Sequence, residues 1–280
     1  MKNILLLTDF SNNAWNAIFA ALKMHEHIRC HFYLLNTYEP SFANILGDKS
    51  KERLGVIYDS LAKNSSIELD KIISYLEDNH KNNNHTFEKR SISNDLVSAV
   101  KEICTEKDID MIVMGTKGAT GAKEIFMGSN TVELIKKVNN CPIFAVPSEH
   151  DFKDLSIVLF PTEFTRPYTK YELKPLIELA TIWDSEILIC YVAQEFTLLE
   201  EQLANKWVLT KRLDKVAHSF HNVELQATVA DSISNFAEET MADIIVMINY
   251  EHTFIEKLTR EAVVKKVGFH SKIPLLVLPE

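Results

Sequence analysis

Four of the chain's seven glycines lie within fourteen positions of one another: Gly115, Gly118, Gly121 and Gly128. A glycine has no Cβ, so Gly115 and Gly118 can turn the chain sharply at positive φ and leave their amides open to an anion. Such a cluster in a glycine-poor chain needs a local cause. The spacing predicts a place where the backbone comes close to a phosphate group.

A predicted helix start follows the last of these glycines. Ser129, Asn130 and Thr131 are residues that cap helices, and the apolar pattern then continues over 132–138. The first amides of a helix have no partner within the helix, and the dipole makes that end attractive to phosphate. The two features together predict a cradle for a phosphate chain. The alternative is a glycine-bearing loop that only closes a strand–helix connection, but the order of strand, glycines, cap and helix favours the cradle.

Apolar strands must place this segment at the carboxyl ends of the strands of a sheet. The run 111–114 predicts a buried parallel strand that ends at Gly115, and the run 4–7 predicts a first strand that ends at Thr8 and Asp9. A second strand over 32–35 ends near Thr37. Helical patterns lie between the strands, and this alternation predicts an α/β fold with a parallel, doubly wound sheet and right-handed crossovers.

The pattern restarts halfway along the chain. Residues 157–165 repeat the character of 4–11, with Thr-Glu-Phe-Thr in place of Thr-Asp-Phe-Ser, and 243–247 repeat 110–114. The end of the chain, 273–279, repeats 141–147. Repetition on this scale predicts two similar domains, over residues 1–149 and 150–280.

With these motifs the chain resembles the universal stress protein family. The pattern G-x2-G-x9-G-[ST], matched by Gly115, Gly118, Gly128 and Ser129, is similar to that family's ATP-binding signature. The opening and closing strands are similar as well, in both copies. The resemblance implies two tandem Rossmann-like, five-stranded sheets of strand order 3-2-1-4-5. It also implies that the closing strands, 143–146 and 275–278, pair across the two domains, so that one chain imitates a dimer.

The resemblance also assigns a binding site in the crevice between the ends of the first and fourth strands. The Asp9 carboxylate would hold ribose hydroxyls, backbone at Thr37 would meet the adenine, and Lys117 would contact the phosphates. Asp9 has a second interpretation as a helix N-terminal charge, and Lys117 one as a solvated loop residue. ATP, accompanied by Mg²⁺ or Mn²⁺, is the expected ligand. The expected site comprises Thr8, Asp9, Phe10, Thr37, Met114, Gly115, Lys117, Gly118, Gly128, Ser129, Asn130 and Thr131.

The second copy lacks these features. Ile248 and Glu251 stand where the first copy has Gly115 and Gly118, and 259–261 read Thr-Arg-Glu near the position of Gly128. Side chains there would block close approach, and the acidic groups would repel a polyphosphate. We therefore expect nucleotide binding in the N-terminal domain only.

Composition excludes several other classes. The net charge of −9 argues against a nucleic-acid binder or a protein that binds anionic membranes. No apolar run approaches the roughly 20 residues of a membrane span. The four cysteines have neither CxxC nor metal-ligand spacing, so we expect reduced core thiols in a cytoplasmic protein. The run His25-Glu26-His27 is more typical of a solvated helix end than of a metal site.

Three functions remain open at this stage. The first is a stress-response protein that binds ATP and acts through partner contacts, and it also fits formation of a homodimer. The second is a scaffold that needs no ligand, and the third is a slow ATPase. The chain has none of the common phosphate-loop or hydrolase motifs, so an enzyme is the less favoured reading. The segment 41–64 could be a lid, a subunit contact or a loop and helix on its own domain, and Ser65 with Glu68 predicts a capping box that starts the next helix.

Overall fold

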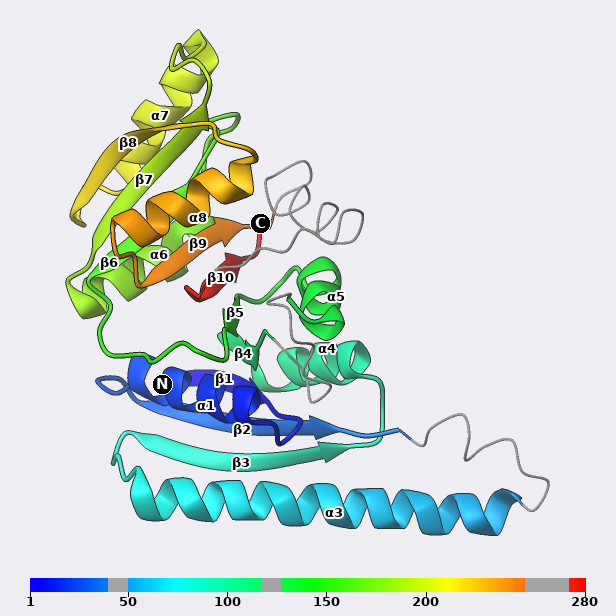
Figure 1. Ribbon diagram of the computed structural model, residues 1–280. Coiled ribbons are helices and arrows are strands. Elements are labelled where there is room, and N and C mark those ends of the chain that lie inside the picture. The colour runs from blue at the N-terminus through cyan, green and yellow to red at the C-terminus, as the bar shows by residue number, and fades with distance from the viewer. Residues whose placement is uncertain (40–49, 117–126, 250–271) are drawn as a thin grey trace.

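The computed structural model describes residues 1–39, 50–116, 127–249 and 272–280. Their strands form one ten-stranded sheet in the order β3-β2-β1-β4-β5-β10-β9-β6-β7-β8 (Figure 1). The first five strands of that order confirm the predicted 3-2-1-4-5 arrangement, and the other five repeat it from the opposite edge. The predicted α/β class is therefore confirmed.

The N-terminal half alternates strands and helices as its hydrophobic pattern predicts. Its elements are β1 (Lys2–Leu7), α1 (Asn12–Met24), β2 (Cys30–Thr37), α3 (Ser50–Asn79), β3 (His85–Ile92), α4 (Leu96–Lys107), β4 (Met111–Gly115), α5 (Ser129–Lys137) and β5 (Ile143–Val146). The central strands are apolar over most of their length because helices cover both faces of the sheet.

The C-terminal half repeats this order over its described residues. Its elements are β6 (Ile157–Pro161), α6 (Lys170–Trp183), β7 (Glu186–Ala193), α7 (Glu200–Arg212), β8 (His218–Glu224), α8 (Val229–Glu239), β9 (Ile244–Ile248) and β10 (Leu275–Leu278). Within each half the strands pair in parallel.

The two halves join through their closing strands. β5 and β10 pair antiparallel, with Phe144 opposite Leu276, and both side chains are fully buried. Each strand thus covers the edge that the other would expose. The indole N–H of Trp183 in α6 also donates to the carbonyl of Met24 at the end of α1, at 3.1 Å. The pairing that the family resemblance implied for these strands is present.

The core continues through both halves in two layers. On one face of the sheet, α1 and α3 share a cluster of buried side chains with α6 and α7. On the other face, α4 and α5 share a cluster with α8. Hydrophobic burial is the main favourable term in folding, so the shared clusters make the stability of each half depend on the other.

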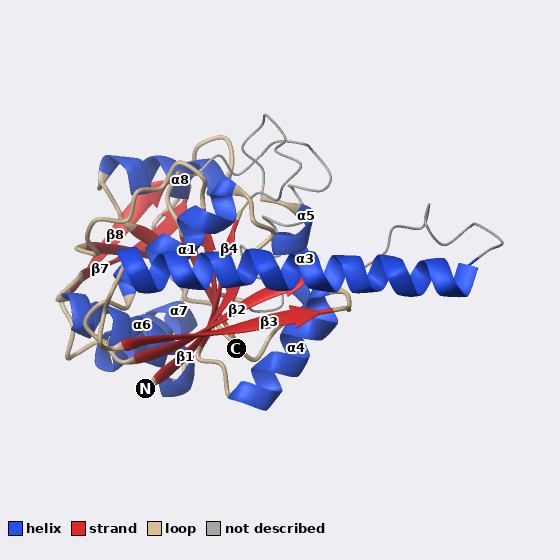
Figure 2. Cartoon of the chain, turned by 90° about the horizontal axis from the view of Figure 1, so that it is seen from below, coloured by secondary structure: helices blue, strands red, loops and turns tan. Residues whose placement is uncertain are grey.

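One helix boundary differs from its prediction. Ser65 does not start a helix, because α3 runs without a break from Ser50 to Asn79. The Ser65 side chain is buried, and its hydroxyl meets the Ser91 hydroxyl of β3 at 2.8 Å. The Ser65 hydroxyl has its hydrogen-bond partner on β3, so it does not cap the helix. The early part of α3 extends past the strands, as Figure 2 shows, while 40–49 lie outside the described residues.

In the described part of the chain, no helix combines the length and the apolar character that a membrane span requires.

Candidate functional site

A pocket of about 410 Å³ opens where β1 and β4 end, at the point where the strand order reverses. Ligands of open α/β sheets bind in such crevices. The volume lies within the ordinary range of small-molecule sites. The pocket is lined by Leu7, Thr8, Asp9, Ala14, Leu35, Asn36, Thr37, Leu96, Met114, Gly115, Gly128, Ser129, Asn130 and Thr131.

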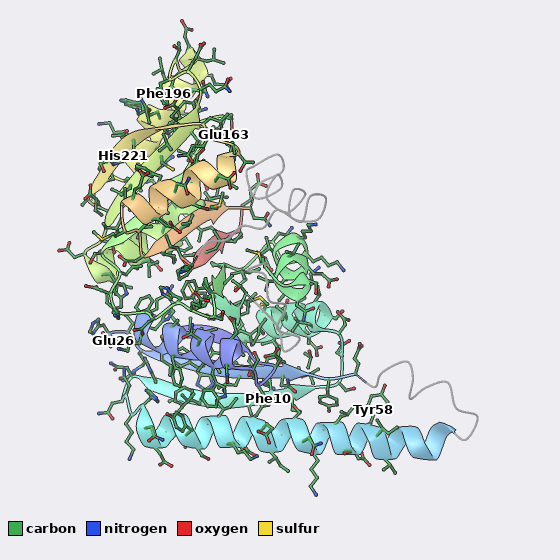
Figure 3. The ribbon with its side chains drawn as sticks, in the orientation of Figure 1. Phe10, Glu26, Tyr58, Glu163, Phe196 and His221 are labelled. Carbon is green, nitrogen blue, oxygen red and sulfur yellow. The ribbon has the colours of Figure 1, made fainter. Side chains whose placement is uncertain are left out.

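The turn after β1 places Asp9 in this pocket. The Thr8 hydroxyl accepts a hydrogen bond from the Phe10 amide at 3.0 Å, and Phe10 takes a left-handed conformation with φ of 65°. The Asp9 carboxylate accepts from the Ser11 amide at 3.0 Å. The loop therefore fixes the backbone of Asp9 on both sides. Phe10 is not among the lining residues and packs against the α1–α3 side of the core (Figure 3).

The N-terminus of α5 supplies the opposite side of the pocket. The helix begins one residue after Gly128, which is the N-cap residue in place of the predicted Ser129 to Thr131. Gly128 has no side chain to cap the first amides, and the first turn carries no acidic residue. The positive end of this helix therefore faces the pocket, and no capping side chain covers its first amides.

Two hydrogen bonds hold the start of α5 against the end of β4. The Gly128 amide donates to the Thr116 carbonyl at 2.5 Å, and the Thr131 hydroxyl donates to the Gly115 carbonyl at 3.2 Å. Thr131 is buried and lines the pocket. These contacts hold the two ends of the glycine-containing segment, Gly115 and Gly128, close together.

Gly115 is a glycine for a different reason from the one expected. It lies in β4, pairs with Val146, and does not have a positive φ. A Cβ at this position would lie 2.0 Å from the side-chain nitrogen of Asn13 in α1. The absent side chain makes room for a close approach of α1 to the sheet. Gly128 likewise has φ of −58°, which any residue can adopt.

Asn36 is a lining residue that sequence reasoning missed. It is buried near the end of β2, and its side-chain amide donates to the Thr8 carbonyl at 2.8 Å. This bond ties the end of β2 to the turn that carries Asp9, while Thr37 lies beside it in the lining. The available signal was a polar residue directly after an apolar strand, which alone does not show that its side chain turns inward.

The structure brings nine of the twelve expected residues into one pocket, namely Thr8, Asp9, Thr37, Met114, Gly115, Gly128, Ser129, Asn130 and Thr131. Lys117 and Gly118 lie outside the described residues, and so do Glu251 and 259–261 of the second copy. Leu96 and Ala14 add apolar surface that the sequence did not single out.

The matching positions of the C-terminal half carry different groups. Strand register places Ile248 where the first half has Gly115, and its buried side chain packs into the core on the side of α6. Thr162 repeats the turn of Thr8, but its hydroxyl also meets the Tyr168 hydroxyl at 2.7 Å. Phe164 is buried, and Asn205 of α7 donates to its carbonyl at 2.9 Å. Ile248, Phe164 and Tyr168 all belong to the core cluster on the α6–α7 face of the sheet, as Phe10 does on the α1–α3 face of the first half.

The described lining of the pocket is almost entirely uncharged. Asp9 carries its only titratable side chain, and the others supply hydroxyls, amides and apolar surface. No group of three or more His, Cys, Asp and Glu suited to a metal occurs among the residues the structure describes. A ligand with hydroxyls at one end and an anionic group at the other would find a carboxylate and a helix N-terminus in the right order.

The sheet order and this pocket define the chain as a Rossmann-like α/β protein with a pocket at its topological switch point. Residues 1–147 match the model of the universal stress protein family, and the chain belongs to that family.

Solved structures show the same fold. A universal stress protein from Archaeoglobus fulgidus DSM 4304 is 17% identical, with 99% of this chain and 98% of that chain covered at a TM-score of 0.69. One from Pseudomonas aeruginosa UCBPP-PA14 is 12% identical, with 100% and 93% covered at a TM-score of 0.58. No curated protein matches the sequence.

Proposed function

We propose that the chain binds ATP, or another adenine nucleotide, in the pocket between β1, β4 and α5. In this proposal the bound and empty forms differ in their affinity for protein partners, and the chain acts in a stress response through those contacts. The observation that carries the proposal is the N-terminus of α5, which faces the pocket with Gly128 as its cap and no capping side chain.

In this proposal each part of the nucleotide contacts a particular group of the protein. The first amides of α5, at Ser129, Asn130 and Thr131, receive the phosphates, helped by the helix dipole. Asp9 on the opposite side receives the ribose hydroxyls. The ends of β2 at Thr37 and of β4 at Met114 flank the base. Lys117 and Gly118 complete the phosphate site in this scheme.

A divalent cation fits this site only as a companion of the phosphates. Mg²⁺ prefers oxygen ligands and is held in nucleotide sites by one or two carboxylates plus phosphate oxygens. Asp9 is the one carboxylate in the described lining. Mg²⁺ or Mn²⁺ would therefore enter with ATP, with most of its ligands from ATP and water.

The proposal restricts binding to one domain. We assign the site to a domain over residues 1–149 and give the domain over 150–280 a structural role, as the second member of a pseudo-dimer within one chain. The β5–β10 pairing, which joins the two halves into one sheet, supports the pseudo-dimer. The four buried thiols, none in a disulfide, support a reducing compartment, the cytoplasm.

Isothermal titration calorimetry with ATP, ADP and AMP tests the proposal. We expect one site per chain and loss of binding in Gly128→Asp, because the new carboxylate would stand at the phosphate end of the pocket. The control is Asp231→Ala, which removes an acidic first-turn residue from α8 in the other half. Absence of heat with every nucleotide would favour the ligand-free scaffold, and steady phosphate release that is lost in Asp9→Ala would favour an ATPase.

A further inference from the structure

Helix α7 lies on the outer part of the C-terminal half (Figure 1), and several of its apolar side chains are exposed. Leu199, Leu203 and Trp207 are 72%, 53% and 63% exposed. Leu203 and Trp207 are four residues apart and so share one side of the helix, Leu199 is the N-cap residue directly before it, and Ala204 is exposed beside them. An apolar face with a tryptophan at its centre is typical of a protein–protein contact.

The opposite face anchors α7 to its own domain. Leu209 and Leu213 are fully buried, and the Asn205 side chain donates to the Phe164 carbonyl. Lys206 lies over the Phe220 ring, 4.5 Å from its centroid. The helix is therefore held in place with its apolar face outward.

The two ends of α7 carry opposite charges. Glu200 and Glu201 lie in the first turn, and Lys211 and Arg212 lie in the last. When two copies of the helix lie antiparallel about a two-fold axis, the acidic start of one meets the basic end of the other. The register that places Glu200 opposite Lys211 also places Ala204 opposite Trp207. A large side chain then faces a small one at the centre, and opposite charges face each other at the rim.

We propose that this face of α7 binds a second copy of the same chain, as an antiparallel helix pair about a two-fold axis. The spacing of Glu200, Ala204, Trp207 and Lys211 is four, three and four residues, which keeps them on one seam. A two-fold contact must be self-complementary, and this seam is so in both size and charge. The contact is one short helix from each copy, which gives a weak, concentration-dependent dimer. It is independent of nucleotide binding.

Sedimentation velocity over a concentration series tests this contact. Wild-type protein is expected to shift from monomer to dimer, and Trp207→Glu to raise the dissociation constant by at least about tenfold. Trp207 is exposed, so the variant should melt like wild type. The matched control is Tyr171→Glu, at an 87% exposed aromatic residue on α6, which should leave the dimer intact.

Charge exchange tests the register itself. Glu200→Lys and Lys211→Glu should each weaken self-association, because like charges then face each other at both ends of the seam. An equimolar mixture of these two variants should recover dimer, since every pair across the seam then has opposite signs. A wild-type chain that stays monomeric at its highest soluble concentration, a dimer unchanged by Trp207→Glu, or a mixture that does not recover would each overturn the proposal.

Discussion

Gly115 of β4 and Asn13 of α1 lie so close that a Cβ on residue 115 would be 2.0 Å from the Asn13 side-chain nitrogen and 3.1 Å from the Asn13 backbone carbon. The same Asn13 side chain donates to the Val146 carbonyl of β5 at 3.3 Å. Asn13 therefore holds α1 against two central strands, β4 and β5. The glycine that marks the end of the strand serves packing between helix and sheet.

Gly115→Ala should destabilise the fold by about 1–3 kcal/mol, because the methyl group would force α1 and β4 apart. Urea unfolding would measure the change. In the double variant with Asn13→Ala, part of the loss should be recovered, since the closest clash is with that side chain. The control is Gly55→Ala in α3, where nothing lies within 4 Å, and helix propensity predicts a gain of roughly 0.5–1 kcal/mol. A loss at residue 55 equal to that at residue 115 would contradict this account.

Asp9→Asn should weaken ATP binding by about tenfold or more, because a ribose hydroxyl donates a stronger hydrogen bond to a carboxylate than to a neutral amide oxygen. The asparagine keeps an oxygen that can accept from the Ser11 amide, so the turn should survive. Glu163→Gln makes the same change in charge at the matching position of the C-terminal half. Equal loss of affinity in both variants would count against a site confined to the first half.

The buried pair Arg166–Glu172 should matter far more than an exposed pair. The carboxylate of Glu172 lies 2.5 Å from Arg166, with the two side chains 4% and 18% exposed. Burial alone would raise the pKa of Glu172, but hydrogen bonds from Arg166 and Thr169 outweigh it and lower that pKa. Removing the carboxylate in Glu172→Ala should cost about 3–5 kcal/mol, because it leaves a mostly buried guanidinium without this counter-charge.

A surface pair provides the comparison for that measurement. Lys137 and Glu133 of α5 form an exposed i,i+4 pair, and Glu133→Ala should change the unfolding free energy by only about 0.5 kcal/mol. Thermal melts of both variants would show whether burial makes the difference. Because the pKa of Glu172 is lowered, its contribution should be present near neutral pH and fall away only as the pH drops through that lowered pKa.

His25 is buried at the end of α1, whereas the sequence suggested a solvated helix end, and it should make the fold sensitive to mild acid. Burial lowers the pKa of this histidine from 6.5 to about 4, and its ring lies 2.9 Å from the Ala21 carbonyl. The unfolded chain therefore binds a proton that the folded chain excludes. The contribution is complete above the unfolded pKa and is lost as the pH falls from 6.5 towards 4.

Urea unfolding at a series of pH values measures this effect. Wild type should lose roughly 2–3 kcal/mol between about pH 7 and about pH 4.5 from this residue, at about 1.4 kcal/mol per unit of pKa shift. His25→Gln cannot take up a proton and should show a smaller loss over the same range. The pKa of His85, whose ring contacts the His25 carbonyl, is also lowered by burial, so some pH dependence should remain. Parallel curves for the two proteins would rule out this role.

The sequence by itself was enough for the repeat, the α/β alternation and the position of the pocket. These follow from local patterns: apolar runs that must be buried on both faces, glycines and cap residues at strand ends, and their recurrence after residue 150. The parallel topology then brings the ends of β1 and β4 together, so Asp9 and Gly128 line one pocket although they are far apart in the chain.

Only the tertiary structure decided matters that depend on partners distant in sequence. Ser65 has the spacing of a helix cap, yet it meets Ser91 of β3, so the helix runs through it. Asn36 turns inward because Thr8 offers its carbonyl there. The physical reason is that a short motif fixes which hydrogen bonds and contacts a residue is able to make, whereas packing between elements selects the ones it makes.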